Sequence, residues 1–136
     1  MNLADVIQML RTRNETVPKP PRLPTADEVD AAERRLKVRF HPDFRRFLLE
    51  ASDVVYGVLE PVTITQPDSH ADLFQVAETA WEESGLPRGL VPICEDNADF
   101  YCMNSSGEVV FWSHNGSSSE KWHDLAEWIE QVWLAE

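Results

Sequence analysis

Residues 90–112 read LVPICEDNADFYCMNSSGEVVFW, and this stretch decides the fold class. It holds three short runs rich in β-branched and aromatic residues, at 90–94, 99–103 and 109–112. Such runs are typical of strands, and the turn-forming residues 104–107 (Asn-Ser-Ser-Gly) join the last two. We therefore predict three consecutive strands that pair as an antiparallel meander.

Apolar residues at helical spacing predict helices on both sides of this meander. Thr25 and Glu28 form a capping-box pattern, and Pro42 suits the first turn of a helix. Four of the nine prolines lie between residues 18 and 24 and predict an extended connector. We expect helices at residues 3–12, 26–38, 42–51, from 69 or 70 to 84, and at the C-terminal end, where Trp122, Leu125, Ile129, Val132 and Trp133 form one stripe.

The remaining segments complete the predicted architecture. Residues 54–58 and 62–65 are rich in β-branched residues and predict two more short strands, whereas residues 113–119 predict a polar, flexible loop. Helices, strands, a helix, strands and a helix follow one another along the chain. This order predicts an α+β fold: one domain with an antiparallel or mixed sheet and helices packed mainly on one face.

Acidic residues are concentrated in the second part of the chain. The net charge is −12; residues 1–50 carry ten Lys/Arg and eight Asp/Glu, and residues 51–136 carry two and sixteen. Such a surface repels phosphate backbones and anionic lipids, so we expect no direct binding to nucleic acid or membranes. A basic protein is the natural partner, although acidic charge also serves solubility.

Basic residues are concentrated in a short segment of the first part, between residues 34 and 46. They could bind phosphate, but they also occupy the solvent faces of two predicted helices, and we favour that second interpretation. The residues are Arg34, Arg35, Lys37, Arg39, Arg45 and Arg46.

No targeting signal is expected, because the N-terminus lacks a basic region followed by an apolar run. The longest uncharged apolar stretch, residues 54–59, is far shorter than the roughly 20 residues that span a bilayer. We therefore expect a cytoplasmic protein. Cys94 and Cys102 fit neither a Cys-x-x-Cys nor a zinc pattern, so we expect reduced, buried thiols.

The sequence contains no recognised motif for catalysis or for a cofactor. Glu95, Asp96 and Asp99 could supply oxygen ligands to a cation, but they lack the spacing of a calcium loop. His114 and His123 have no identifiable nucleophile. We predict no catalytic, cofactor or metal site. Five tryptophans offer binding anchors instead. We expect Trp81, Trp122 and Trp133 in the core; Trp128 at the edge of its helix and Trp112 on a strand could either be exposed as anchors or pack under neighbouring loops.

Several segments together resemble the SUKH superfamily, which contains yeast cell-wall-synthesis regulators and many bacterial toxin-immunity proteins. Leu23-Pro24 before an acidic helix and residues 40–48 (FHPDFRRFL) are similar to the family's opening motif. Residues 90–93 and 99–112 resemble its paired strands, and residues 125–129 (LAEWI) its last helix. The resemblance covers residues 22–136 and leaves residues 1–21, a helix and a proline-rich connector, outside. Ala98 stands where the family usually has Gly, which suggests a less strained turn.

The resemblance implies a non-catalytic binding domain. Bacterial members neutralise a polymorphic toxin, nuclease-like or otherwise acting inside cells, by direct contact. Together with the acidic charge, this predicts an immunity protein that binds a basic cognate toxin through an acidic, partly aromatic surface. Two alternatives are an intracellular adaptor or regulatory scaffold of the cell-wall-regulator kind, and a small enzyme working through His114 or His123. The predicted partner-binding residues are Asp68, Asp72, Glu95, Asp96, Asp99, Trp112 and His114.

Overall fold

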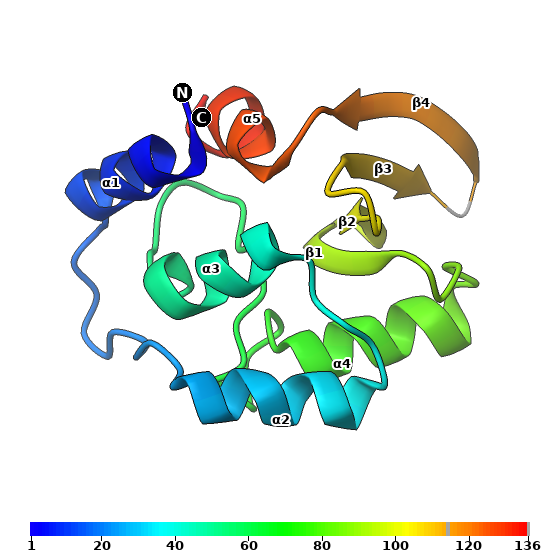
Figure 1. Ribbon diagram of the computed structural model, residues 1–136, viewed down its shortest axis with the longest axis horizontal. Helices are drawn as coiled ribbons and strands as arrows, with labels where there is room; N and C mark the ends of the chain where they lie inside the picture. Colours follow the sequence, from blue (N-terminus) through cyan, green and yellow to red (C-terminus); the bar gives the residue numbers. More distant parts are fainter. Residues whose placement is uncertain (114, 136) are drawn as a thin grey trace.

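The meander predicted from residues 90–112 forms a sheet at the right-hand side of the structure, a computed structural model that describes residues 1–113 and 115–135 (Figure 1). The sheet has the order β1-β2-β3-β4, with every neighbouring pair antiparallel, which confirms the α+β class. Its strands are β1 (Val91–Asp96), β2 (Asp99–Met103), β3 (Val109–Ser113) and β4 (Gly116–Trp122).

The fourth strand corrects the expectation of a flexible loop at residues 113–119. Residues 116–122 pair with β3, for example Val109 with Trp122 and Val110 with Lys121. Serine has a low strand propensity, but β3 presents a free row of backbone donors and acceptors at this edge of the sheet. Pairing with that row decides the conformation of the segment.

The two strands expected at residues 54–58 and 62–65 do not form, so this prediction was wrong. Two isolated bridges, Pro61 with Cys94 and Thr63 with Asp72, occur in their place. Pro61 has no N–H and cannot continue a ladder along β1. The β-branched residues serve the core instead: Val62 is fully buried, and its N–H bonds to the carbonyl of Ile93 at 2.9 Å.

A helix forms at each predicted place, but the last one begins at Leu125, so Trp122, expected on its apolar stripe, belongs to β4 instead. The helices gather to the left of the sheet and below it in Figure 1. Thr25 accepts a hydrogen bond from the N–H of Glu28, whose carboxylate accepts one from the N–H of Thr25, so the capping box is present. The fourth helix begins later than expected, behind Asp72 as its N-cap. The helices are α1 (Leu3–Arg13), α2 (Ala26–Leu36), α3 (Pro42–Ala51), α4 (Leu73–Glu78) with a π-helical extension η1 (Thr79–Glu83), and α5 (Leu125–Trp128) with a second such extension η2 (Ile129–Trp133).

One continuous core joins the helices to the sheet. Trp133 lies in it as expected, and Trp128, for which the sequence left both exposure and packing open, is only 1% exposed. Its ring packs 5.3 Å from that of Tyr101, because α5 lies between α1 and the sheet and both of its sides are covered. Trp81 and Trp122, expected in the core, are half-buried at its edge.

Candidate binding surface

The β1–β2 turn gathers three of the predicted partner-binding carboxylates, those of Glu95, Asp96 and Asp99. Asp96 pairs with Asp99 across a two-residue connection, Asn97-Ala98. Both connecting residues have a positive φ, 52° and 69°, as a tight hairpin turn of this length requires. The expectation of a less strained turn at Ala98 was therefore wrong, since alanine there holds a conformation that favours glycine.

A shallow hollow of about 110 Å³ lies beside this turn. Glu60 forms an ion pair with His70 on one side of it, and Glu95 and Asp96 lie on the other. Val58 completes the rim. We call these five residues, Val58, Glu60, His70, Glu95 and Asp96, the acidic hollow.

Val58 is unusual among the apolar residues, because 86% of its surface is exposed. The loop that carries it is tied to the segment after α1. The N–H of Glu15 donates to the carbonyl of Val55 at 2.8 Å, Asn14 accepts from the N–H of Val55 at 2.8 Å, and Glu15 accepts from the N–H of Gly57 at 3.1 Å. An apolar side chain held in solvent beside charged groups is the pattern of an anchor with a polar rim.

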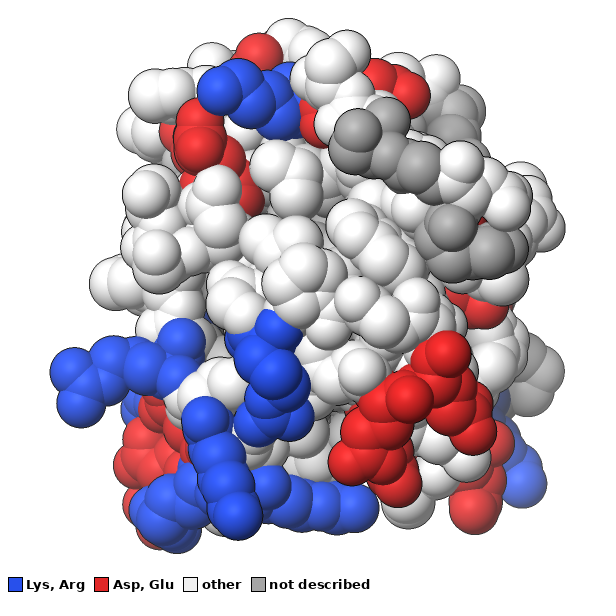
Figure 2. Space-filling model, turned by 90° about the vertical axis from the view of Figure 1, so that its right-hand side faces the viewer, with Lys and Arg blue, Asp and Glu red and all other residues white. Residues whose placement is uncertain are grey.

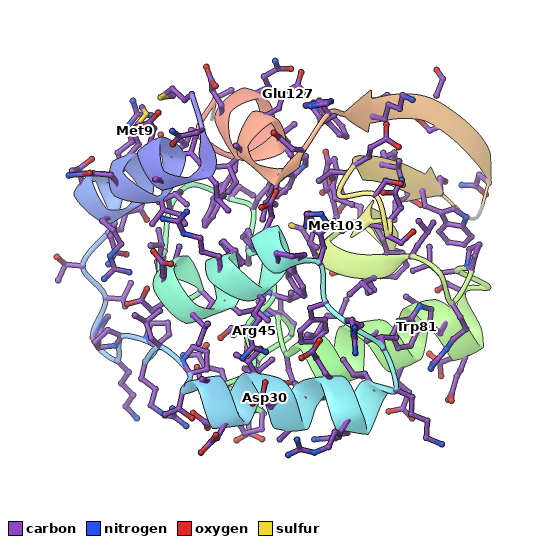
Figure 3. The ribbon with its side chains drawn as sticks, viewed as in Figure 1. Met9, Asp30, Arg45, Trp81, Met103 and Glu127 are labelled. Carbon is purple, nitrogen blue, oxygen red and sulfur yellow. The ribbon has the colours of Figure 1, made fainter. Side chains whose placement is uncertain are left out.

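The carboxylates of the acidic hollow differ from those of the helical half in their ion pairing. In α2, Asp30 and Glu33 bind Arg45 at 2.8 and 3.1 Å, and Figure 3 shows Arg45 and Asp30 facing each other. In the part of the chain that the structure describes, no lysine or arginine nitrogen lies within 4 Å of Glu60, Glu95 or Asp96. The acidic hollow therefore keeps a negative potential, whereas arginines neutralise the carboxylates of Asp30 and Glu33 in α2 and of Glu50 in α3.

The other predicted residues lie apart from the hollow or outside the description. Trp112 of β3 pairs with Phe100, with ring centroids 6.3 Å apart, and is half-buried. Asp68 is exposed in the loop before α4. His114 lies outside the described residues.

Asp72 has a structural role. Its side chain accepts a hydrogen bond from the N–H of Gln75 at 3.2 Å and caps α4, and the residue is only 6% exposed. Burial raises the pKa of this carboxyl, while the N–H of Gln75 and the charge of Arg35 oppose the rise. Asp72 offers little surface to a partner.

Val58, Glu60 and His70 are not among the predicted binding residues, because we expected Val58 in a strand, Glu60 at the break between two strands and His70 at the start of a helix. One signal was present in the sequence. Val58 lies between Gly57 and Pro61, two residues that interrupt regular secondary structure, and the acidic Glu60 follows it closely.

A second hollow of about 370 Å³ lies between the α2–α3 corner, the start of β1 and the β2–β3 turn. Its floor is apolar and buried, and Met103 lies between the N-terminal end of α3 and the sheet in Figure 3. We call it the basic groove; its floor is Phe40, Phe44 and Met103, and its rim carries Arg39 and Arg88. From the sequence, we expected the charges of this corner to lie on the solvent faces of the helices.

The described residues contain neither a cluster of metal-ligand side chains nor a membrane-spanning helix. These residues contain no group of three or more His, Cys, Asp or Glu side chains placed to hold a metal ion. Among the helices of residues 1–113 and 115–135, none has both the length and the apolar content needed to cross a bilayer.

Comparisons with known proteins identify one family and one similar structure. The SUKH_5 family model, described as SMI1-KNR4 cell-wall, matches residues 3–134. This range also takes in α1 and the proline-rich connector. The crystal structure of a protein from Pseudomonas syringae pv. tomato is 44% identical, covers 98% of this chain and 99% of its own, and superimposes with a TM-score of 0.93. No curated protein matches the chain.

Proposed function

Because the chain belongs to the SUKH_5 family, whose domains are of the immunity or regulator type, we propose that it is an immunity protein. It acts in the cytoplasm by binding a cognate toxin, and it neutralises that toxin by contact and without catalysis. The partner is basic, and the acidic hollow is the surface that meets it.

The observation that carries this proposal is the exposed Val58 beside the carboxylates of Glu60, Glu95 and Asp96. Glu60 already contacts His70, but none of the three carboxylates is neutralised by a lysine or arginine of the described residues, so they attract a basic surface over several ångströms and raise the rate of association. An apolar side chain that becomes buried at the centre of the contact slows dissociation. Fast association and slow dissociation together suit a protein that must bind a toxin before the toxin acts.

Co-expression with the product of the adjacent gene tests the proposal. The test variant is Glu60→Gln/Glu95→Gln/Asp96→Asn combined with Val58→Ser. We expect it to lose protection of growth and to bind the purified toxin domain at least 100-fold more weakly in calorimetry.

A matched control removes the same number of charges from α4 and η1, by Glu78→Gln/Glu82→Gln/Glu83→Gln. All three glutamates are exposed, and the variant is expected to protect like the original chain. Equal binding by the two variants would refute the assignment of the surface. A stable complex without protection of growth would favour the adaptor or scaffold of the cell-wall-regulator kind.

A further inference from the structure

The basic groove has the properties of a binding site. Its volume of about 370 Å³ is at the lower end of the range for ligand sites, roughly 300–1,000 Å³. Phe40, Phe44 and Met103 form its floor and are at most 4% exposed, so the cavity is backed by the rigid core. Val91 of β1 and Pro42 of α3 form apolar walls.

The wall next to the β2–β3 turn is also held in place. His41 lines the groove, and its Nδ1 accepts a hydrogen bond from the N–H of Asp43 at 3.1 Å. The imidazole packs so closely on Gly107 that a Cβ at residue 107 would lie 2.6 Å from its Nε2. A groove with fixed walls binds a ligand with little loss of conformational freedom.

The cations at the rim are free to bind an anionic ligand. Across the described residues, no carboxylate oxygen lies within 4 Å of Arg39 or Arg88 at the rim, or of Arg34 and Lys37, which lie outside the groove lining, whereas Arg45 on the same corner is paired. The lysine and arginine side chains at the lower left of Figure 2 gather beside a largely uncharged area. In a chain of net charge −12, this is a local positive field.

Arg88 is also pre-oriented. Its guanidinium donates a hydrogen bond to the carbonyl of Leu36 at 3.0 Å and lies 4.1 Å from the centre of the Trp81 ring. These contacts use one donor and one face of a group that has five donors. The remaining donors can bind a carboxylate at the rim.

We propose that the basic groove binds an acidic peptide segment of a partner protein. A bulky apolar side chain of that segment lies on the Phe40, Phe44 and Met103 floor, and neighbouring carboxylates pair with Arg39 and Arg88. An apolar floor with few cations around it favours a peptide over a nucleic acid, which needs a long track of positive charge. The proposal does not depend on the acidic hollow.

The groove and the acidic hollow are separate sites. Val91 lines the groove and Asp96 lines the hollow, and they stand at opposite ends of β1. At about 3.4 Å per residue, the strand places them roughly 17 Å apart. One domain can therefore hold a basic partner at one end of β1 and an acidic segment at the other.

An array of 12-residue peptides tests the proposal. Each peptide consists of Asp and Glu with one Leu, Phe or Trp, and the tightest one is labelled for fluorescence anisotropy. We expect Arg39→Glu to weaken binding at least tenfold and Ser105→Phe, which fills the mouth of the groove, to do the same. Replacing the apolar residue of the peptide by Ala is expected to weaken binding to a similar extent.

Matched controls distinguish binding in the groove from nonspecific effects of the changed charge and side-chain size. Lys19→Glu makes the same charge change in the exposed connector, and Ser106→Phe places the same ring one residue away, outside the groove lining. Both are expected to change affinity less than twofold, as is the variant of the acidic hollow. The proposal is overturned if no peptide binds, if test and control variants behave alike, or if a twelve-residue oligothymidine binds more tightly than the peptide.

Discussion

Replacing Gly107 by Ala tests how the β2–β3 turn and the α2–α3 corner depend on each other. Gly107 has a φ of +90°, and an added Cβ would lie 2.6 Å from Nε2 and 2.9 Å from Cε1 of His41. Two separate costs are therefore expected: strain in the backbone, and displacement of an imidazole that is held by its bond to Asp43.

Two other glycines separate these costs. Gly85 has a φ of +82° with no atom within 4 Å of an added Cβ, so Gly85→Ala reports backbone strain alone, about 1–2 kcal/mol. Gly89 has neither problem, and Gly89→Ala is expected to change stability by less than about 0.5 kcal/mol or to increase it. Gly107→Ala adds an overpacking cost of about 1–3 kcal/mol to the strain and should destabilise by about 2–5 kcal/mol in total.

A second substitution isolates the contact. His41→Ser keeps a good N-cap for α3 and removes the ring, so Gly107→Ala in that background should cost only the strain. The coupling between the two sites is then about 1–3 kcal/mol.

The free energies of unfolding come from urea titrations followed by tryptophan fluorescence and by far-ultraviolet circular dichroism, with coincident transitions as the check for two-state behaviour. The reasoning is refuted if Gly107→Ala costs no more than Gly85→Ala, or if the substitutions at 41 and 107 are additive.

Three further predictions concern single residues. Asp72→Asn keeps the cap of α4 and removes a carboxylate whose pKa burial raises; it should be more stable than the original chain at pH 7, and the difference should shrink as the pH falls toward 3.8 in a series of urea titrations. Ala98→Gly relieves the positive φ in the β1–β2 turn and should stabilise by about 0.5–1 kcal/mol, and unchanged or reduced stability would contradict the strain assigned there. Cys94 and Cys102 are buried free thiols, and burial raises the pKa of Cys102 far above its ordinary value; neither should react with Ellman's reagent at pH 8 until urea unfolds the chain.

The elements whose signals are local could be predicted from the sequence. Thr25, Glu28 and Pro42 mark helix starts through bonds and backbone angles within one turn, and each lies where expected. The meander could be predicted for the same reason, because short turns join strands that follow one another along the chain.

The elements that depend on distant partners could not be predicted. Residues 116–122 are a strand because β3 lies beside them, and Val62 is a core residue because Ile93 holds its backbone. The same contrast between local and distant signals applies to the candidate sites. The three carboxylates of the β1–β2 turn are neighbours in sequence and could be named from it as candidates, whereas the groove joins Arg39 to Arg88 across the fold and could not be recognised.

The two edge strands of the sheet, β1 and β4, also affect whether the protein aggregates at high concentration. Beyond β1, Pro61 forms a bridge with Cys94 and can offer no N–H to an additional strand. Along β4, Ser118 accepts a hydrogen bond from the N–H of Glu120 at 3.0 Å, and the exposed charges of Glu120 and Lys121 follow. Charges and local side-chain bonds of this kind discourage pairing between sheets of different molecules. The fold thus carries its own protection against edge-to-edge aggregation, provided by the two segments whose structure the sequence pattern misrepresents.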